Sequence, residues 1–358
     1  MNKIIITTIL SSITLFIFQV SSGQGCVAIR STGGYCGMQH TDSSEWQFSI
    51  NNRYFKSFRH FVGDEEQKQR QELGTEVINH SMATDLTIQK KLNARWSVMV
   101  NMPVLTNSRS SLYEHANAGR YTTHSFGIGD MRIAVYRWLW NPEKLYKGNL
   151  QVGLGIKLPT GAYNYQDYFQ LSDSTKRLGP VDQSIQLGDG GTGITLELNG
   201  FYNLSHGLSL YGNFYYLSNP REQNGVSTAR GGTTSATAIA NGSDVMSVPD
   251  QVMLRAGVNW SVRNLTVSAG LREEVLPVYD LIGGSNGFRR PGRIMDVEPG
   301  VTYSLKKVNL FAYVPVAIYR NRTQSVPDKN ATARSGKYTQ GDAAFADYVI
   351  NVGATFRF

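Results

Sequence analysis

The last twelve residues of the chain, 347–358, constrain its fold more than any other stretch. Every second residue there is apolar or aromatic, namely Tyr348, Ile350, Val352, Ala354, Phe356 and Phe358. The residues between them are mostly polar or small. Because the side chains of a β-strand point alternately to its two faces, this spacing predicts a strand with one apolar and one mostly polar face.

The aromatic residue on which the chain stops adds a second constraint. A final strand of this pattern that ends on Phe358 is similar to the assembly signal of bacterial outer-membrane β-barrels, which implies the barrel-assembly machinery as a partner. In lipid an open strand edge is not viable, so the last strand has to pair with the first. We therefore expect a transmembrane antiparallel up-and-down β-barrel in a bacterial outer membrane.

Residues 1–23 have the composition of a secretory signal peptide. Lys3 precedes a largely apolar run, residues 4–20, and small residues follow up to Gly23. Cleavage after Gly23 would leave a mature chain that begins at Gln24. Cleavage before Cys26 would make a lipoprotein instead, but the lipoprotein signal prefers an aliphatic residue where this chain has Gly23.

The remaining composition fits a barrel and argues against other classes. No run of about 20 apolar residues follows the signal peptide, which excludes a helical membrane protein. The net charge of +8 is spread along the chain rather than gathered in a basic run, so nucleic acid is a poor partner. Attraction to anionic lipopolysaccharide or to an anionic solute stays open. No linker divides residues 45–358, which we expect to form one barrel domain.

The two cysteines of the chain, Cys26 and Cys36, lie close together in residues 24–44. In an exported chain such an isolated pair most simply forms a disulfide. A metal site is the alternative, but only His40 is nearby to complete it. We expect a short disulfide segment that either enters the barrel as a plug or lies in the periplasm.

Alternation and turn residues divide the rest of the chain into about twelve strands. The expected strands are 45–61, 80–92, 94–105, 123–140, 148–160, 192–203, 207–217, 251–262, 265–276, 293–305, 308–319 and 347–358. Tight links at 93, 141–147, 204–206, 263–264 and 306–307 alternate with long ones. Short turns on one side and long loops on the other are typical of outer-membrane barrels with both termini in the periplasm.

Charged residues of these strands are expected to point into the barrel. A charge on the lipid face would cost about 2–4 kcal/mol at the bilayer midplane, so an inward position is favoured. The strand 308–319 is expected to send Tyr313 and Tyr319 inward as well. The inner wall then either fills a narrow interior with ion pairs or lines a small pore, and its proposed pathway residues are Arg132, Lys157, Glu197, Arg255, Arg272, Glu274 and Glu298.

One part of the wall carries a family resemblance. The runs 127–136 (Gly-Ile-Gly-Asp-Met-Arg-Ile-Ala-Val-Tyr) and 153–161 (Gly-Leu-Gly-Ile-Lys-Leu-Pro-Thr-Gly) resemble the paired signature of the outer-membrane channels of the phenol-degradation meta-pathway (MetA) family. The runs 189–193 and 200–202 are similar to the next hairpin of that family. The resemblance implies a barrel that transports small, often hydrophobic, molecules.

The function that we expect is passive uptake or efflux of small molecules, hydrophobic or aromatic ones included, which needs no cofactor. A structural or receptor barrel is the alternative, since the long loops 161–191 and 218–250 could bind a partner. An outer-membrane lipid hydrolase is less favoured. Neighbouring His and Ser residues point to opposite faces of a strand, and only a cross-strand couple such as His60 with Ser81 could act as base and nucleophile.

Overall fold

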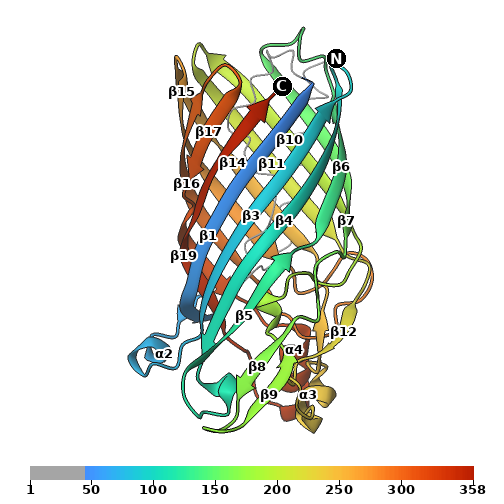
Figure 1. The fold of residues 1–358 in the computed structure, drawn as a ribbon, viewed down its shortest axis with the longest axis vertical. Coiled ribbons are helices and arrows are strands. Elements are labelled where there is room, and N and C mark those ends of the chain that lie inside the picture. Colours follow the sequence, from blue (N-terminus) through green and yellow to red (C-terminus); the bar gives the residue numbers. More distant parts are fainter. Residues whose placement is uncertain (1–44) are drawn as a thin grey trace.

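The expected pairing of the last strand with the first is confirmed in the computed structural model, which describes residues 45–358. Strand β19 (Ala343–Arg357) runs antiparallel to β1 (Trp46–Val62), from Gln47 opposite Arg357 to Phe61 opposite Ala343. This pairing closes an antiparallel barrel of twelve strands (Figure 1). Because β19 returns to β1, the main sheet is closed on itself, as a bilayer requires.

The wall between these two strands follows the order of the chain. Two of its twelve positions are each made of two consecutive short strands, β5 with β6 and β17 with β18. The remaining wall strands are β3 (Ile78–Lys91), β4 (Trp96–Ser111), β5 (Tyr121–Ile128), β6 (Met131–Trp138), β7 (Gly148–Leu158), β10 (Gly193–Ser205), β11 (Leu208–Ser218), β14 (Gln251–Val262), β15 (Leu265–Leu276), β16 (Gly292–Ser304), β17 (Val308–Tyr313) and β18 (Val316–Arg322).

The connections alternate between short turns and long segments, as predicted. The short turns and both ends of the described chain lie at the upper end of Figure 1, which is the periplasmic end for a barrel of this kind. The long segments gather at the lower, extracellular end. They contain β2 (Glu65–Glu66), α2 (Gln69–Glu72), the 3-10 helix η1 (Tyr113–His115), β8 (Gln166–Gln170), β9 (Lys176–Pro180), the 3-10 helix η2 (Gln183–Ile185), β12 (Gln223–Ser227), α3 (Ala236–Asn241), β13 (Val245–Ser247) and α4 (Val326–Ser335).

Residues 123–140 do not form the single strand that alternation predicts. The chain leaves the ladder at Gly129 and Asp130, so β5 pairs only with β4, whereas β6 pairs with both β4 and β7. The interruption also changes which residues face inward, because Ser125 is buried on one side of it and Arg132 on the other. A break in this position brings the extracellular end of the wall next to the loop that follows β7.

A second interruption falls at Val314 and Pro315, and it corrects one expectation. Pro315 has no backbone N–H to give to a ladder, so the strand expected over 308–319 is divided into β17 and β18. A bulge in β18 then places Ala317 opposite Asp296 and Tyr319 opposite Met295. Because Asp296 is buried inside the barrel, Tyr319 lies on the outer face and not in the lumen as expected.

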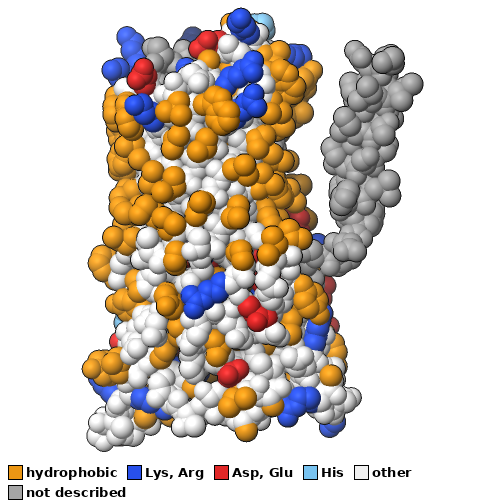
Figure 2. Space-filling view, turned by 90° about the vertical axis from the view of Figure 1, so that its right-hand side faces the viewer, with side chains coloured by type: hydrophobic (Ala, Val, Ile, Leu, Met, Phe, Trp, Pro, Cys, Tyr) orange, Lys and Arg blue, Asp and Glu red, His pale blue; other side chains and the backbone are white. Residues whose placement is uncertain are grey.

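The outer surface of the wall is apolar over most of its height. On the face shown in Figure 2, hydrophobic side chains are frequent over the upper and middle parts of the barrel, whereas other side chains dominate its lower, extracellular part. Exposed aromatic side chains lie near the periplasmic ends of the strands, as in an interfacial girdle. They include Trp96, Trp140, Tyr202, Trp260, Tyr303 and Phe356. Within the described residues, no helix is long and apolar enough to cross a membrane.

Aromatic rings in the lumen lie directly over glycines of the neighbouring strand. A Cβ atom on Gly300 would come within 2.1 Å of Tyr313 Cδ1, and one on Gly353 within 2.4 Å of Phe311 Cζ. Both rings are buried, and they pack against each other with centroids 5.8 Å apart. The absence of a side chain at these two positions is thus what lets the rings lie flat against the wall.

We expect Gly300→Ala to destabilise the barrel by about 1–3 kcal/mol, because the added methyl group forces the Tyr313 ring out of its position. Urea unfolding of the barrel refolded into lipid vesicles measures this free energy. Gly212→Ala is the matched control, since its Cβ would meet nothing closer than the Arg255 carbonyl oxygen at 3.8 Å. Its effect should stay within about 0.5 kcal/mol, and an equal loss at both positions would contradict this account.

Candidate solute pathway in the barrel lumen

The structure buries all seven of the charged residues that the sequence suggested as pathway residues. They lie on β6, β7, β10, β14, β15 and β16, and each is at most 7% exposed: Arg132, Lys157, Glu197, Arg255, Arg272, Glu274 and Glu298. Their sequence neighbours on the same strands, such as Ile133, Leu254 and Leu271, are exposed on the lipid face. The charges therefore belong to the inner wall, where all of them except Lys157 form two groups.

The first group joins β6 to β10. Arg132 Nη1 donates a hydrogen bond to Glu197 Oε1 at 2.7 Å, and Tyr136 Oη donates to the same oxygen at 2.9 Å. The Arg132 guanidinium also lies 5.3 Å from the centroid of the Tyr215 ring on β11. Charge-assisted hydrogen bonds of this kind are stronger than neutral ones, so this group holds β6 and β10 together on the inner face of the wall, over the intervening β7.

The second group joins β14, β15 and β16. Glu298 accepts hydrogen bonds from Arg255, and its other oxygen lies 3.4 Å from Arg272 Nη1. Arg272 also donates to Glu274, through Nε at 2.7 Å. Two guanidinium groups and two carboxylates thus compensate one another inside the barrel, as buried charges must. This part of the lumen is filled by ion pairs rather than open.

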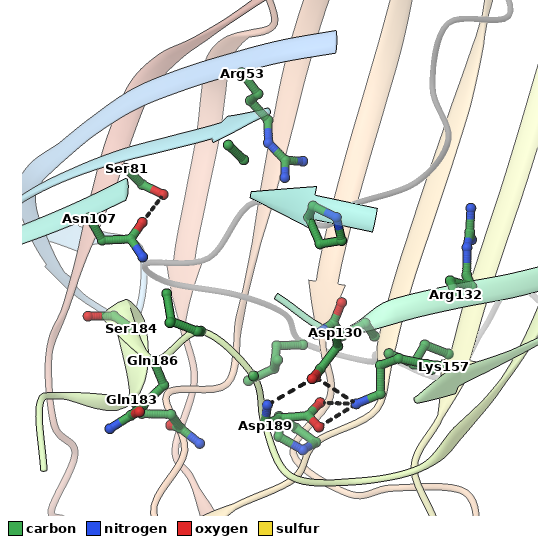
Figure 3. A pocket seen from close by; sticks show the side chains of 18 of the residues that line it. Arg53, Ser81, Asn107, Asp130, Arg132, Lys157, Gln183, Ser184, Gln186 and Asp189 are labelled. Carbon is green, nitrogen blue, oxygen red and sulfur yellow. Dashed lines mark hydrogen bonds and ion pairs between the residues drawn. The ribbon is translucent and has the colours of Figure 1, made fainter. Parts of the chain in front are cut away.

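Lys157 belongs to neither group, because it links the wall to the loop between β7 and β10. Its Nζ donates to both carboxylate oxygens of Asp189 and lies 3.6 Å from Asp130 Oδ2, as Figure 3 shows. Asp130 in turn accepts hydrogen bonds from the backbone N–H groups of Gly161 at 3.0 Å and Asp189 at 3.1 Å. We call these three side chains, Asp130, Lys157 and Asp189, the loop clamp.

The loop clamp explains why the wall is interrupted at Gly129 and Asp130. The Thr160 hydroxyl accepts a hydrogen bond from Met131 N and donates one to Gly129 O, both at 2.8 Å, which replaces ladder bonds at the break. Gly188 packs against Asp130 so closely that a Cβ atom there would overlap the carboxylate. The clamp therefore draws both ends of the loop 161–189 onto the wall at one point.

Residues 181–188 of this loop, which we call the roof segment, fold into the mouth of the barrel. The carbonyl oxygen of Ile185 accepts hydrogen bonds from Ser125 and from Asn107. Leu187 packs against Ala83 and Leu105 of the wall, and both Ile185 and Leu187 are almost completely buried. The roof segment is thus part of the barrel interior and not a surface loop.

Asp182 fastens the roof segment to two distant parts of the chain. Its carboxylate accepts two hydrogen bonds from Arg290, at 2.9 and 2.7 Å, and lies 3.5 Å from Arg109 Nη2. It also caps η2 by accepting from Ser184 N at 3.0 Å. Burial by itself would raise the pKa of Asp182, but Arg109 and Arg290 hold this pKa well below its usual range. The carboxylate is therefore charged at neutral pH.

On the periplasmic side of the roof segment, the described residues line an inner cavity of about 150 Å³. Its lining combines apolar side chains with polar and charged ones, among them those that Figure 3 labels. The apolar part includes Phe55, Ala83, Pro103, Leu187, Leu217 and Leu276, and the charged part includes Arg53, Asp130, Arg132, Lys157, Asp189 and Arg290. A concave site that combines apolar side chains with placed polar and charged ones can bind a small molecule that has both kinds of surface.

Only two of the seven residues that the sequence suggested for the pathway, Arg132 and Lys157, line this cavity. Sequence reasoning missed Asp182, Leu187 and Arg290, because all three lie in long loops that have no alternation. The Gly-Asp-Gly-Gly run that begins at Gly188 was a usable signal, since it marks where the loop returns to the wall. No periodic pattern could have joined Asp182 to Arg290, which lies 108 positions further along the chain.

The couple that a hydrolase could have used is not formed. His60 Nε2 accepts the backbone N–H of Val77 at 2.8 Å, and its Nδ1 lies 2.8 Å from Asp342 Oδ2. Ser81 donates its hydroxyl proton to Asn107 at 2.8 Å. The expected signal peptide and the expected disulfide between Cys26 and Cys36 lie outside the described residues, and so does the N-terminal segment for which a plug and a periplasmic position were the two alternatives.

No protein-family model and no curated protein sequence matches the chain. Solved structures match its fold. An outer-membrane channel from Pseudomonas putida F1 superposes with a TM-score of 0.60 over 92% of this chain and 100% of that one, at 10% identity. This chain is a bacterial outer-membrane β-barrel. The CymD monoaromatic hydrocarbon channel gives a TM-score of 0.43 over 95% and 98% of the two chains, at 11% identity. The translocator domain of the autotransporter NalP from Neisseria meningitidis gives a TM-score of 0.44 over 89% of this chain and 90% of that one, at 12% identity.

We expect Glu298→Gln to destabilise this outer-membrane barrel by about 3–5 kcal/mol, because it removes a carboxylate that two buried guanidinium groups contact. Glu143→Gln is the control, since Glu143 is mostly exposed and lies 3.7 Å from Lys91, and such a pair contributes at most about 1 kcal/mol. Urea unfolding in lipid vesicles measures both. If Glu298→Gln lowered the free energy of unfolding as little as Glu143→Gln does, the ion pairs of the lumen would be hydrated and not buried.

Proposed function

We propose that this barrel is a passive outer-membrane channel for small hydrophobic or aromatic molecules and that it carries out no covalent chemistry. The observation that carries the proposal is the inner cavity, which lies between the wall and the roof segment and combines apolar side chains, such as Phe55 and Leu187, with polar and charged ones. A barrel that only anchors a receptor needs no such cavity. Arg255, Arg272, Glu274 and Glu298, which lie in the lumen outside the cavity, are paired with one another, so they would restrict the pathway and not open a wide aqueous pore.

Two resemblances support this function. The motif residues that resemble the MetA family, Asp130 and Lys157 among them, form the loop clamp that positions the roof of the cavity. A solved structure that shares the fold over the whole of its length, at a TM-score of 0.60, is an outer-membrane channel. The pathway residues suggested from the sequence then divide into two roles: Arg132 and Lys157 would contact the solute, whereas the other five would hold the wall together.

Ala83→Trp should reduce the entry of benzamide, a small neutral aromatic molecule, into vesicles that contain the full chain. Ala83 is buried at the inner cavity beside Leu187, so an indole in its place fills the cavity, and we expect a loss on the order of tenfold. The rate is measured by stopped-flow mixing and compared with protein-free vesicles of the same lipid.

The matched control is Ala256→Trp, the same substitution on the lipid face of β14, where Ala256 is exposed. It should leave the entry rate of benzamide close to that of the original protein. If both variants carry benzamide as fast as the original, or if the original protein adds nothing to the rate of protein-free vesicles, the channel function is wrong.

A further inference from the structure

Two cavities meet at the roof segment. The inner cavity lies on the periplasmic side of this segment. An outer cavity of about 410 Å³ lies among the extracellular segments, between the roof segment, β13 and α4. Gln183 and Arg290 line both cavities. Because a side chain that borders two cavities has to lie between them, these two residues form the partition that a solute would have to cross.

An ion pair holds this partition in place. Asp182 and Arg290 share two parallel hydrogen bonds, and the Asp182 side chain is only 4% exposed. The same carboxylate caps η2, the turn that carries Gln183. Separating Asp182 from Arg290 would therefore release both the side chain and the backbone of the partition.

Both cavities combine a cationic group with apolar surface. In the outer cavity the Arg290 guanidinium lies 4.7 Å from the centroid of the Phe288 ring, and Met246 and Pro327 add further apolar surface. In the inner cavity Lys157 lies in the same lining as Phe55 and Leu217. A solute with an aromatic ring and one carboxylate would find a matching position on each side of the partition.

We propose that the solutes are small aromatic carboxylates, and that the solute carboxylate replaces Asp182 on Arg290 as it crosses the partition. This inference rests on the proposed channel function and names its solute class. A carboxylate presents the two oxygens that fit the guanidinium fork, so the exchange keeps the buried arginine paired throughout. A neutral aromatic molecule cannot make this exchange, and a carboxylate without a ring gains nothing from Phe288.

The test measures the entry of three probes into vesicles that contain the full chain at pH 7.5. Benzoate has both the ring and the charge, benzamide has the ring alone, and acetate has the charge alone. For the original protein we expect benzoate entry to saturate at lower concentration than acetate entry, and benzamide entry not to saturate over the same range.

Variants of the two partners should shift benzoate entry in opposite directions. Asp182→Asn removes the competing carboxylate and should lower the half-saturating benzoate concentration about tenfold. Arg290→Gln removes the fork that binds the solute and should raise it about tenfold. Arg290→Lys keeps the charge but lacks the guanidinium fork, so its half-saturating benzoate concentration should lie between those of the original protein and of Arg290→Gln.

Arg293→Gln is the matched control, because it breaks an arginine–carboxylate pair, that with Glu273, on the outer face and away from both cavities. It should leave benzoate entry unchanged. Shifts of Asp182→Asn and Arg290→Gln in the same direction would show a merely structural pair and overturn this inference, as would benzoate entry that does not saturate. The channel function would survive either result if benzamide still enters faster than in protein-free vesicles, and it fails together with the inference if neither aromatic probe does.

Discussion

A bilayer offers no partner to a backbone N–H group or to a charged side chain, and the rest of this structure follows from that constraint. The backbone groups are satisfied because β19 returns to pair with β1, which leaves the barrel without an open edge. The charges are satisfied because alternation turns them inward, where Arg132 meets Glu197 and Arg255 meets Glu298. The price is a lumen partly filled by ion pairs, and a solute has to pass where these pairs leave space.

That space is located by the loop clamp. Asp130 lies where β5 and β6 are interrupted, and it binds the backbone at both ends of the loop that follows β7. The loop is therefore held at both of its ends, and its roof segment folds into the extracellular mouth of the barrel instead of extending from the membrane. In this way a short motif on the wall determines the shape of a cavity that is built largely from other residues.

Much of the fold could be predicted from the sequence, because the lipid and lumen faces impose a strict period of two on each strand. The links at 263–264 and 306–307, the long loops and the inward position of Glu298 all follow from that period. What could not be predicted is where the period fails. Gly129 and Asp130 shift the pattern by leaving the ladder, and a bulge near Ile318 turns Tyr319 outward.

The cavity and its partition were even less predictable. Asp182 and Arg290 meet only because two loops from different parts of the barrel fold over the same mouth, and neither loop has a repeating pattern. Sequence reasoning found the wall side of the site, Arg132 and Lys157, and missed its loop side for this reason.

The most direct test of the account is the single-channel conductance of the purified full chain in a planar bilayer, recorded beside a sixteen-stranded porin in the same salt. A narrow passage between paired charges predicts steady openings that are much smaller than those of the porin. A folded barrel that shows no openings at all would contradict a continuous pathway, and openings as large as those of the porin would contradict a lumen restricted by ion pairs and a roof.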